Sequence, residues 1–201
     1  HSRIESAPAN ADHRNRGEWA HLAALSPTLL GVTFVDDRHG WAFGTRGSLL
    51  NTHDAGVTWI TRDMGTSTMS FYAAGFRDAN AGWIVGGQGT ILTTDDGGIN
   101  WSREDNVSKG TFRMVNVNSD GSVMTVDSSG SVTKISGGDE GWTGPVGRTT
   151  RWFHAVDFSD ALMGWGVGTR GDIQQTTDGA LNWHTQKSGV SSMLLDVQFL
   201  N

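Results

Sequence analysis

The sequence repeats itself about every 41 residues, and this period constrains the fold more than any other feature. One tryptophan recurs at spacings of 42, 41 and 41 residues, at Trp59, Trp101, Trp142 and Trp183. Two further series keep the same spacing: Trp41, Trp83, Met124 and Trp165, and Phe34, Phe76, Val117, Phe158 and Phe199. Three series in one register are not chance, so the chain must consist of structural repeats that stack on one another.

Each repeat has the sequence pattern of four short strands. In the second repeat these are residues 72–78, which end in Phe-x-Asp, residues 82–86, which start at Gly-Trp, residues 90–93, and a strand led by Trp101. Four short strands in about 41 residues are typical of one propeller blade. We therefore predict an all-β fold, a β-propeller of four-stranded blades that is incomplete, with four full blades and partial ones at both ends.

The repeat boundaries also predict the domain organisation. Residues 1–16 are polar and are expected to be a leader or linker, and residues 17–201 are expected to form propeller blades. Full repeats are expected at about 30–70, 71–111, 112–152 and 153–192, and partial blades at 17–29 and 193–201. Because an open propeller leaves strand edges unpaired, the chain is expected to be a fragment of a longer propeller or to associate with a second chain that completes the ring.

The tight turn before the outer tryptophan has a motif of its own. It reads Thr52–Trp59, Thr94–Trp101 and Thr176–Trp183, and it resembles the Asp-box of bacterial sialidases, Ser/Thr-x-Asp-x-Gly-x-Thr/Asn-Trp. The carboxylate can accept hydrogen bonds from the turn, glycine supplies a positive φ, and tryptophan packs between sheets. We therefore interpret the motif as structural at Asp54, Gly56, Trp59, Asp96, Gly98, Trp101, Asp178 and Trp183. Ala180 replaces the glycine of the last copy, where a strained or differently shaped turn is expected.

A longer pattern narrows the resemblance. Residues 82–89, Gly-Trp-Ile-Val-Gly-Gly-Gln-Gly, lead into the Asp-box that starts at Thr94, and together they resemble a repeat of the photosystem II stability/assembly factor family. The resemblance covers about residues 30–201. It implies a seven-bladed propeller in an extracytoplasmic space (periplasmic, lumenal or secreted) that binds a protein partner, in photosynthetic members through an arginine-rich patch.

Blade geometry places a second set of residues on the face opposite the Asp-boxes. These residues lie in the turns between second and third strands, at the entry to the first strand, or in a linker between blades. They are Arg46, Gln88 and Arg170 in the turns, Tyr72, Arg113 and His154 at the entry, and Arg151 and Trp152 in the linker. We predict that they bind a protein or peptide partner through charge-assisted hydrogen bonds. The other explanation for these arginines is that they are ordinary solvated side chains.

The sequence favours a non-enzymatic scaffold over an enzyme. Tyr72 is the only tyrosine, and no spacing supplies it with the glutamate that a sialidase nucleophile requires, so we assign no catalytic residue. We expect no cofactor or metal, because no histidines stand at ligand spacing and the chain has no cysteine. A net charge of −6 disfavours nucleic acid, and no apolar stretch is long enough for a membrane span. The alternative is a carbohydrate-binding or sialidase-like glycoside hydrolase propeller, for which Trp152 is the best exposed aromatic.

Overall fold

The structure is a computed structural model that describes residues 27–65, 68–104, 109–118, 120–128, 130–135, 142–149 and 152–199. The leader expected at residues 1–16 lies outside the described residues, as does all but the end of the partial blade expected at 17–29. No helix in the described part of the chain is long and apolar enough to cross a membrane.

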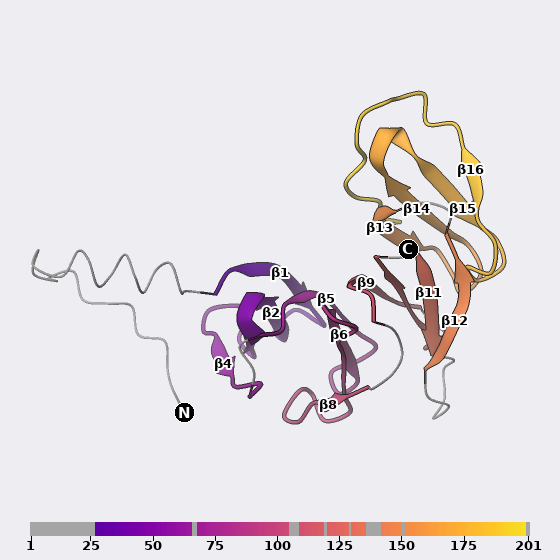
Figure 1. Cartoon of the computed structure of the whole chain (residues 1–201). Helices are drawn as coiled ribbons and strands as arrows, with labels where there is room; N and C mark the ends of the chain where they lie inside the picture. Colours follow the sequence, from indigo (N-terminus) through magenta and orange to yellow (C-terminus); the bar gives the residue numbers. More distant parts are fainter. Residues whose placement is uncertain are drawn as a thin grey trace, which may run out of the picture. The chain divides into compact units, whose positions relative to one another are not determined.

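The described residues form four four-stranded antiparallel sheets, one for each full repeat (Figure 1). The first sheet contains β1 (Leu29–Phe34), β2 (Gly40–Gly44), β3 (Leu49–Thr52) and β4 (Ile60–Arg62). The second contains β5 (Phe71–Phe76), β6 (Gly82–Gly86), β7 (Ile91–Thr94) and β8 (Ser102–Arg103). The third contains β9 (Phe112–Val117), β10 (Val123–Asp127), β11 (Ser131–Ile135) and β12 (Thr143–Arg148). The fourth contains β13 (Phe153–Phe158), β14 (Gly164–Gly168), β15 (Ile173–Thr176) and β16 (His184–Gln186).

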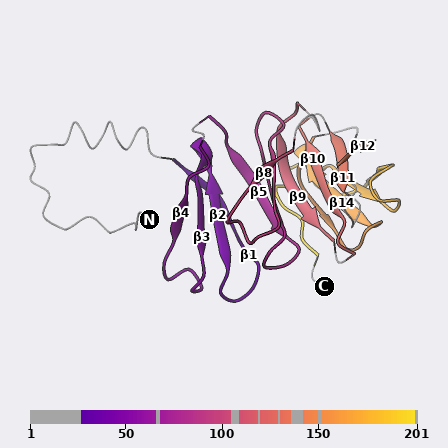
Figure 2. The ribbon, with the colours of Figure 1, turned by 90° about the horizontal axis from the view of Figure 1, so that it is seen from below.

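In every sheet the strands follow one another in chain order, so each repeat forms one blade by itself (Figure 2). This order confirms the prediction of an all-β fold made of four-stranded blades. It includes the third repeat, which has Met124 in place of the recurrent tryptophan and still forms a complete sheet. The chain divides into two compact units: the first sheet belongs to residues 1–70, and the other three belong to residues 71–201.

Within the second unit, the first strands of the blades are neighbours, because β9 contacts both β5 and β13. The cores lie between successive sheets. Between the third and fourth sheets, Met124, Val126 and Val132 belong to one cluster with Val156 and Phe158. Side chains of the second and third strands of one blade therefore pack on the first strand of the next, which is how a blade buries faces that it cannot cover alone.

The recurrent tryptophan packs against the recurrent phenylalanine of its own blade. The ring centroids of Phe34 and Trp59 lie 6.2 Å apart in an edge-to-face arrangement, and the same geometry recurs in the second and fourth blades. Trp183 also packs against the core between the third and fourth sheets. These contacts explain why two of the sequence series keep a constant spacing: they belong to one aromatic pair that joins the first strand to the start of the fourth.

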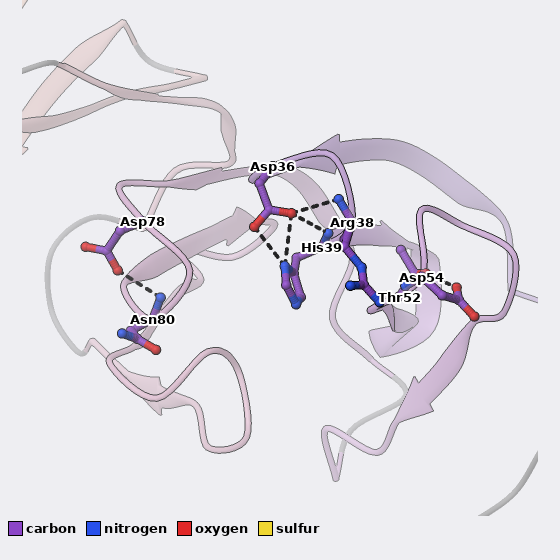
Figure 3. Close-up of polar contacts among 7 residues, drawn as sticks. All are labelled: Asp36, Arg38, His39, Thr52, Asp54, Asp78 and Asn80. Carbon is purple, nitrogen blue, oxygen red and sulfur yellow. Dashed lines mark hydrogen bonds and ion pairs between the residues drawn. The ribbon is translucent and has the colours of Figure 1, made fainter.

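The Asp-box turn is closed by hydrogen bonds around its threonine and aspartate. In the first copy, Thr52 Oγ1 donates to Asp54 Oδ1 (2.8 Å) and accepts from the N–H of Gly56 (2.9 Å), and Figure 3 shows the Thr52–Asp54 contact. Asp54 also accepts from the side chain and the backbone N–H of Thr58. These bonds lower the pKa of Asp54 to about 2, the Thr58 hydroxyl first among them.

The copy with alanine keeps the same turn. The N–H of Ala180 donates to Thr176 Oγ1 (3.0 Å), as the glycines of the other two copies do. Its φ is +73°, close to the +83° of Gly56 and the +76° of Gly98. The turn therefore keeps its shape and holds an L-residue in the left-handed region, which costs about 1–2 kcal/mol.

A second aspartate turn, between the first and second strands, recurs in three blades. Asp36 Oδ1 accepts the N–H groups of Arg38 and His39, both at 2.8 Å (Figure 3). Asp78 and Asp160 accept the N–H groups two and three residues further on in the same way. These backbone bonds lower the pKa of all three carboxyl groups, that of Asp36 to about 2. The aspartate of the recurrent Phe-x-Asp therefore shapes a turn.

We predict that Gly56→Ala lowers the free energy of unfolding by about 1 kcal/mol, because φ is +83° there but a Cβ finds its nearest atoms, in Trp59 and Phe34, at an ordinary 3.6–3.7 Å. Gly56→Val should cost clearly more, because β-branched residues are outliers at positive φ. Urea denaturation of the two variants measures the difference. Equal losses for alanine and valine would contradict this account of the turn.

Acid should destabilise the fold between about pH 5 and pH 2. The seven turn aspartates with a lowered pKa are Asp36, Asp54, Asp78, Asp96, Asp120, Asp160 and Asp178. A carboxyl group whose pKa is lower in the folded chain stabilises it above its unfolded pKa of about 3.9, and this contribution is lost as the pH falls through the folded value. The Tm followed by circular dichroism should therefore fall over this range, and less steeply in Asp54→Asn. A Tm that stays constant from pH 5 to pH 2 would show that these turns do not contribute.

Candidate functional site

The turns between the second and third strands contain strained polar residues. Arg46, Gln88 and Arg170 have φ of +60°, +57° and +59°, and the glycine after each also has a positive φ. The N–H two residues after each closes the turn, as in the 3.2 Å bond from Ser48 N to Thr45 O. Left-handed backbone costs an L-residue about 1–2 kcal/mol, and strain of this kind is often found at functional sites. All three residues were predicted to bind a partner.

The entry to each first strand contains a β-bulge. The register shifts between Leu29 and Gly31, between Phe71 and Ala73, between Phe112 and Met114, and between Phe153 and Ala155. The extra residues are Leu30, Tyr72, Arg113 and His154. Bulges redirect side chains and are common beside functional sites. Tyr72, Arg113 and His154 were predicted for this position, whereas Leu30 was missed, although it lies one repeat, 42 residues, before Tyr72.

Bulges and strained turns lie at one end of each sheet, and Asp-boxes lie at the other. In the fourth sheet, Phe153 beside the bulge pairs with Gly168, the residue before the turn that contains Arg170. At the opposite end Gly164 pairs with Thr176, which starts the Asp-box. The strand register therefore separates the residues that shape the Asp-box from the residues predicted to bind.

A pocket of about 230 Å³ lies at this end of the third and fourth sheets. Its lining residues are Arg113, Met114, Val126, Asp127, Ser128, Trp152, Phe153 and His154. Three of the predicted partner-binding residues thus meet in one pocket, from β9, from β13 and from the residue before β13. Trp152 is 73% exposed, unlike the tryptophans Trp41 and Trp83 of the second strands, which are buried. Arg151 lies outside the described residues.

Tyr72 holds Arg113 at the edge of the pocket. The guanidinium carbon of Arg113 lies 5.1 Å from the centroid of the Tyr72 ring, within the range of a cation–π interaction. The two residues occupy the bulges of neighbouring blades, so the contact joins β5 to β9. This contact limits the movement of the arginine without neutralising its charge, which leaves the guanidinium able to pair with a carboxylate or a carbonyl group.

Asp127 belongs to the pocket and was missed by the sequence reasoning. It stands at the repeat position that glycine occupies as Gly44, Gly86 and Gly168. At Gly168 a Cβ would collide with the carbonyl oxygen of Trp152, so that glycine is required by close packing of the backbone. In the third blade Asp127 is buried, and its Oδ1 accepts the N–H of Ser131 at 3.1 Å. The aspartate in the glycine series was the signal that could have revealed this position.

The four sheets, their Asp-box turns and the bulged end define the chain as a β-propeller protein with Asp-box repeats. The family model for the photosynthesis system II assembly factor YCF48 matches residues 11–151. The match covers more than half of the chain, which therefore belongs to the YCF48 family. This confirms the resemblance to the photosystem II stability/assembly factors.

Individual relatives agree with the family. A solved structure of YCF48 bound to D1 peptide is 27% identical, with a TM-score of 0.67 over 80% of this chain and 53% of that chain. The photosystem II assembly lipoprotein Ycf48 of Picosynechococcus sp. is 40% identical over 52 residues, 24% of this chain and 15% of the relative. The chain thus spans about half the length of the solved relative. An ancestral GH74 enzyme, 16% identical with a TM-score of 0.58 over 79% of this chain and 25% of its own, shares the fold alone.

We predict that Gln88→Gly stabilises the protein by about 0.5–1 kcal/mol, because glycine adopts φ near +57° without the steric cost. The matched control is Gln88→Ala, which removes the same side-chain amide and keeps a Cβ at positive φ, so it should give no gain. Urea midpoints measured side by side decide between them. If alanine stabilises as much as glycine, the backbone at this turn is not strained.

Proposed function

We propose that this protein is a non-enzymatic scaffold of the assembly-factor type that binds an extended peptide or protein segment at the bulged end of its blades. The observation that carries the proposal is the pocket, in which Arg113, Trp152 and His154 meet. The expected partner-binding set also includes Arg46, Gln88, Tyr72, Arg151 and Arg170.

The chemistry of the pocket suits a peptide. Arg113 offers several N–H donors to a carboxylate or to backbone carbonyl groups, and Tyr72 restrains it before binding. Trp152 offers a large exposed ring at little cost in conformational entropy, a property of residues that dominate binding energy. Polar groups beside one large aromatic ring provide orientation and affinity together.

Membership of the YCF48 family supports the same proposal. The solved relative is bound to D1 peptide, and 80% of this chain superposes on it. We extend peptide binding to this chain on that basis. The Picosynechococcus relative is a lipoprotein, which supports an extracytoplasmic location.

The side chains around Tyr72 argue against a sialidase-like hydrolase. Its ring faces the guanidinium of Arg113. Glu104, the only glutamate in the described part of the chain, follows the outer strand β8, and its Oε1 accepts from Thr93. A retaining hydrolase of that kind needs a glutamate beside its tyrosine nucleophile. We therefore propose no catalytic residue.

Carbohydrate binding is the second candidate, and one observation favours it. The exposed ring of Trp152 and the carboxyl group of Asp127 line the same pocket, and sugar sites combine an aromatic ring with a carboxylate in this way. The two candidates are distinguished by competition, since a soluble glucan oligosaccharide should leave peptide binding at the bulged end unchanged.

We predict that Arg113→Glu weakens the binding of a fluorescein-labelled D1 peptide at least about 10-fold, because a hydrogen bond to a charged group contributes about 1.5–3 kcal/mol. The double variant Arg46→Glu and Arg170→Glu should weaken it too. Both losses should shrink as salt is raised, since exposed charges are screened. Fluorescence anisotropy at low and physiological ionic strength measures the affinities.

Arg38→Glu is the control, because it reverses the same charge on an exposed residue in the turn between β1 and β2, away from the bulged end. Its affinity should match that of the wild type. Loss of binding by Arg38→Glu alone, or wild-type affinity for Arg113→Glu, would contradict the proposed site. Displacement of the peptide by the oligosaccharide would support the carbohydrate candidate instead.

A further inference from the structure

One face of the sheet β1–β4 is apolar and open. Leu29, Val32, Phe34 and Val57 expose 51%, 59%, 48% and 81% of their surfaces. A hollow of about 710 Å³ lies on this sheet, lined by Leu29, Gly31, Val32, Ala42, Leu50, Val57, Thr58 and Trp59, none of them charged. Apolar surface gathered in this way on a soluble protein marks a surface that binds a partner.

The internal repeat shows what such a face packs against. The residues 124 positions after Val32 and Phe34 are Val156 and Phe158, on the fourth sheet. There they are only 8% and 6% exposed, because they share a core with Met124 and Val126 of the third sheet. Trp59 likewise corresponds to Trp183, which packs on that core. The open face therefore fits a four-stranded sheet that presents apolar side chains from its second and third strands.

We propose that the open face of β1–β4 binds the sheet β13–β16 of a second copy of this chain. The residues 41 positions after Met124, Val126 and Val132 are Trp165, Val167 and Ile173, which are apolar as the fit requires. This surface lies apart from the peptide pocket, so the proposal stands independently of the proposed function.

The segment of residues 193–199 shows that β13–β16 accepts a first strand. The ring of Phe199, 41 residues after Phe158, lies 4.4 Å from that of Trp165. The N–H of Leu194 donates to Gly168 O, and the N–H of Phe199 donates to Asp157 Oδ2 (2.7 Å). The segment contains no assigned strand, so it is held by few bonds. The β1 strand of a second copy, with Phe34 in place of Phe199, displaces it.

Two copies suffice to close the assembly. Each copy offers one open β1–β4 face and one β13–β16 face, so the contact is heterologous, and a second such contact closes a ring with twofold symmetry. Two sets of four sheets make eight, which is within the range of known propellers. Closure also explains why a self-complementary chain of this kind would not grow into fibres.

The test is the mass of the full chain by sedimentation velocity and light scattering over a range of concentrations. The wild type should reach a dimer and no higher species. Val32→Asp should weaken association at least about 10-fold, because it buries a carboxylate in an apolar contact. Phe199→Ala should strengthen association, because it removes the ring with which Phe34 of the second copy competes.

The control for the charge is Ile99→Asp, at a residue that is 70% exposed on the second sheet, and it should leave the mass unchanged. Val57→Asp provides a second test on the open face, at a residue too exposed to affect folding, and near-ultraviolet circular dichroism checks that each variant folds. A wild type that is monomeric at its highest soluble concentration would overturn the proposal. So would a dimer that survives both Val32→Asp and Val57→Asp, or a ladder of masses beyond the dimer.

Discussion

The structure depends on one packing interaction: the second and third strands of a blade bury their side chains against the first strand and the tryptophan of the next. A four-stranded sheet is apolar on both faces, and no blade has a core of its own. In the cluster around Met124 and Phe158 the free energy of burial is shared by two repeats. The aromatic pair of Phe158 and Trp183 and the Asp-box behind it fix the edge of each blade so that these faces meet.

The sequence could predict whatever this packing repeats. A side chain that must fill the same space in each blade recurs at a constant spacing, so the Trp and Phe series and the Asp-boxes were visible in the sequence. The bulges were not, because a bulge is a shift of hydrogen-bond register between two strands and leaves no residue type of its own. Leu30 was therefore missed, although Tyr72, Arg113 and His154 at the same position were found from their chemistry.

Departures from the repeat were harder to interpret. Asp127 stands where the other blades have glycine, and only the structure shows that its carboxyl group is buried and bonded to Ser131. Ala180 is the reverse case: the sequence indicated an altered turn, and the hydrogen bonds of the turn hold alanine in the geometry of glycine. A substitution within a repeat can therefore create a site or be absorbed, depending on the neighbouring backbone.

The same register that builds the blades keeps stability and binding apart. Asp-box carboxylates close turns at one end of each sheet, whereas strained turns and bulges, which weaken the backbone, gather at the other end. The pocket around Trp152 and Arg113 lies between two blades of one unit and needs no residue from a second copy. The open face at Val32 belongs to the stacking of blades and carries no group that could hold a peptide carboxylate. Completion of a ring and capture of a peptide are thus separate uses of one repeat, the first set by the faces of the sheets and the second by their ends.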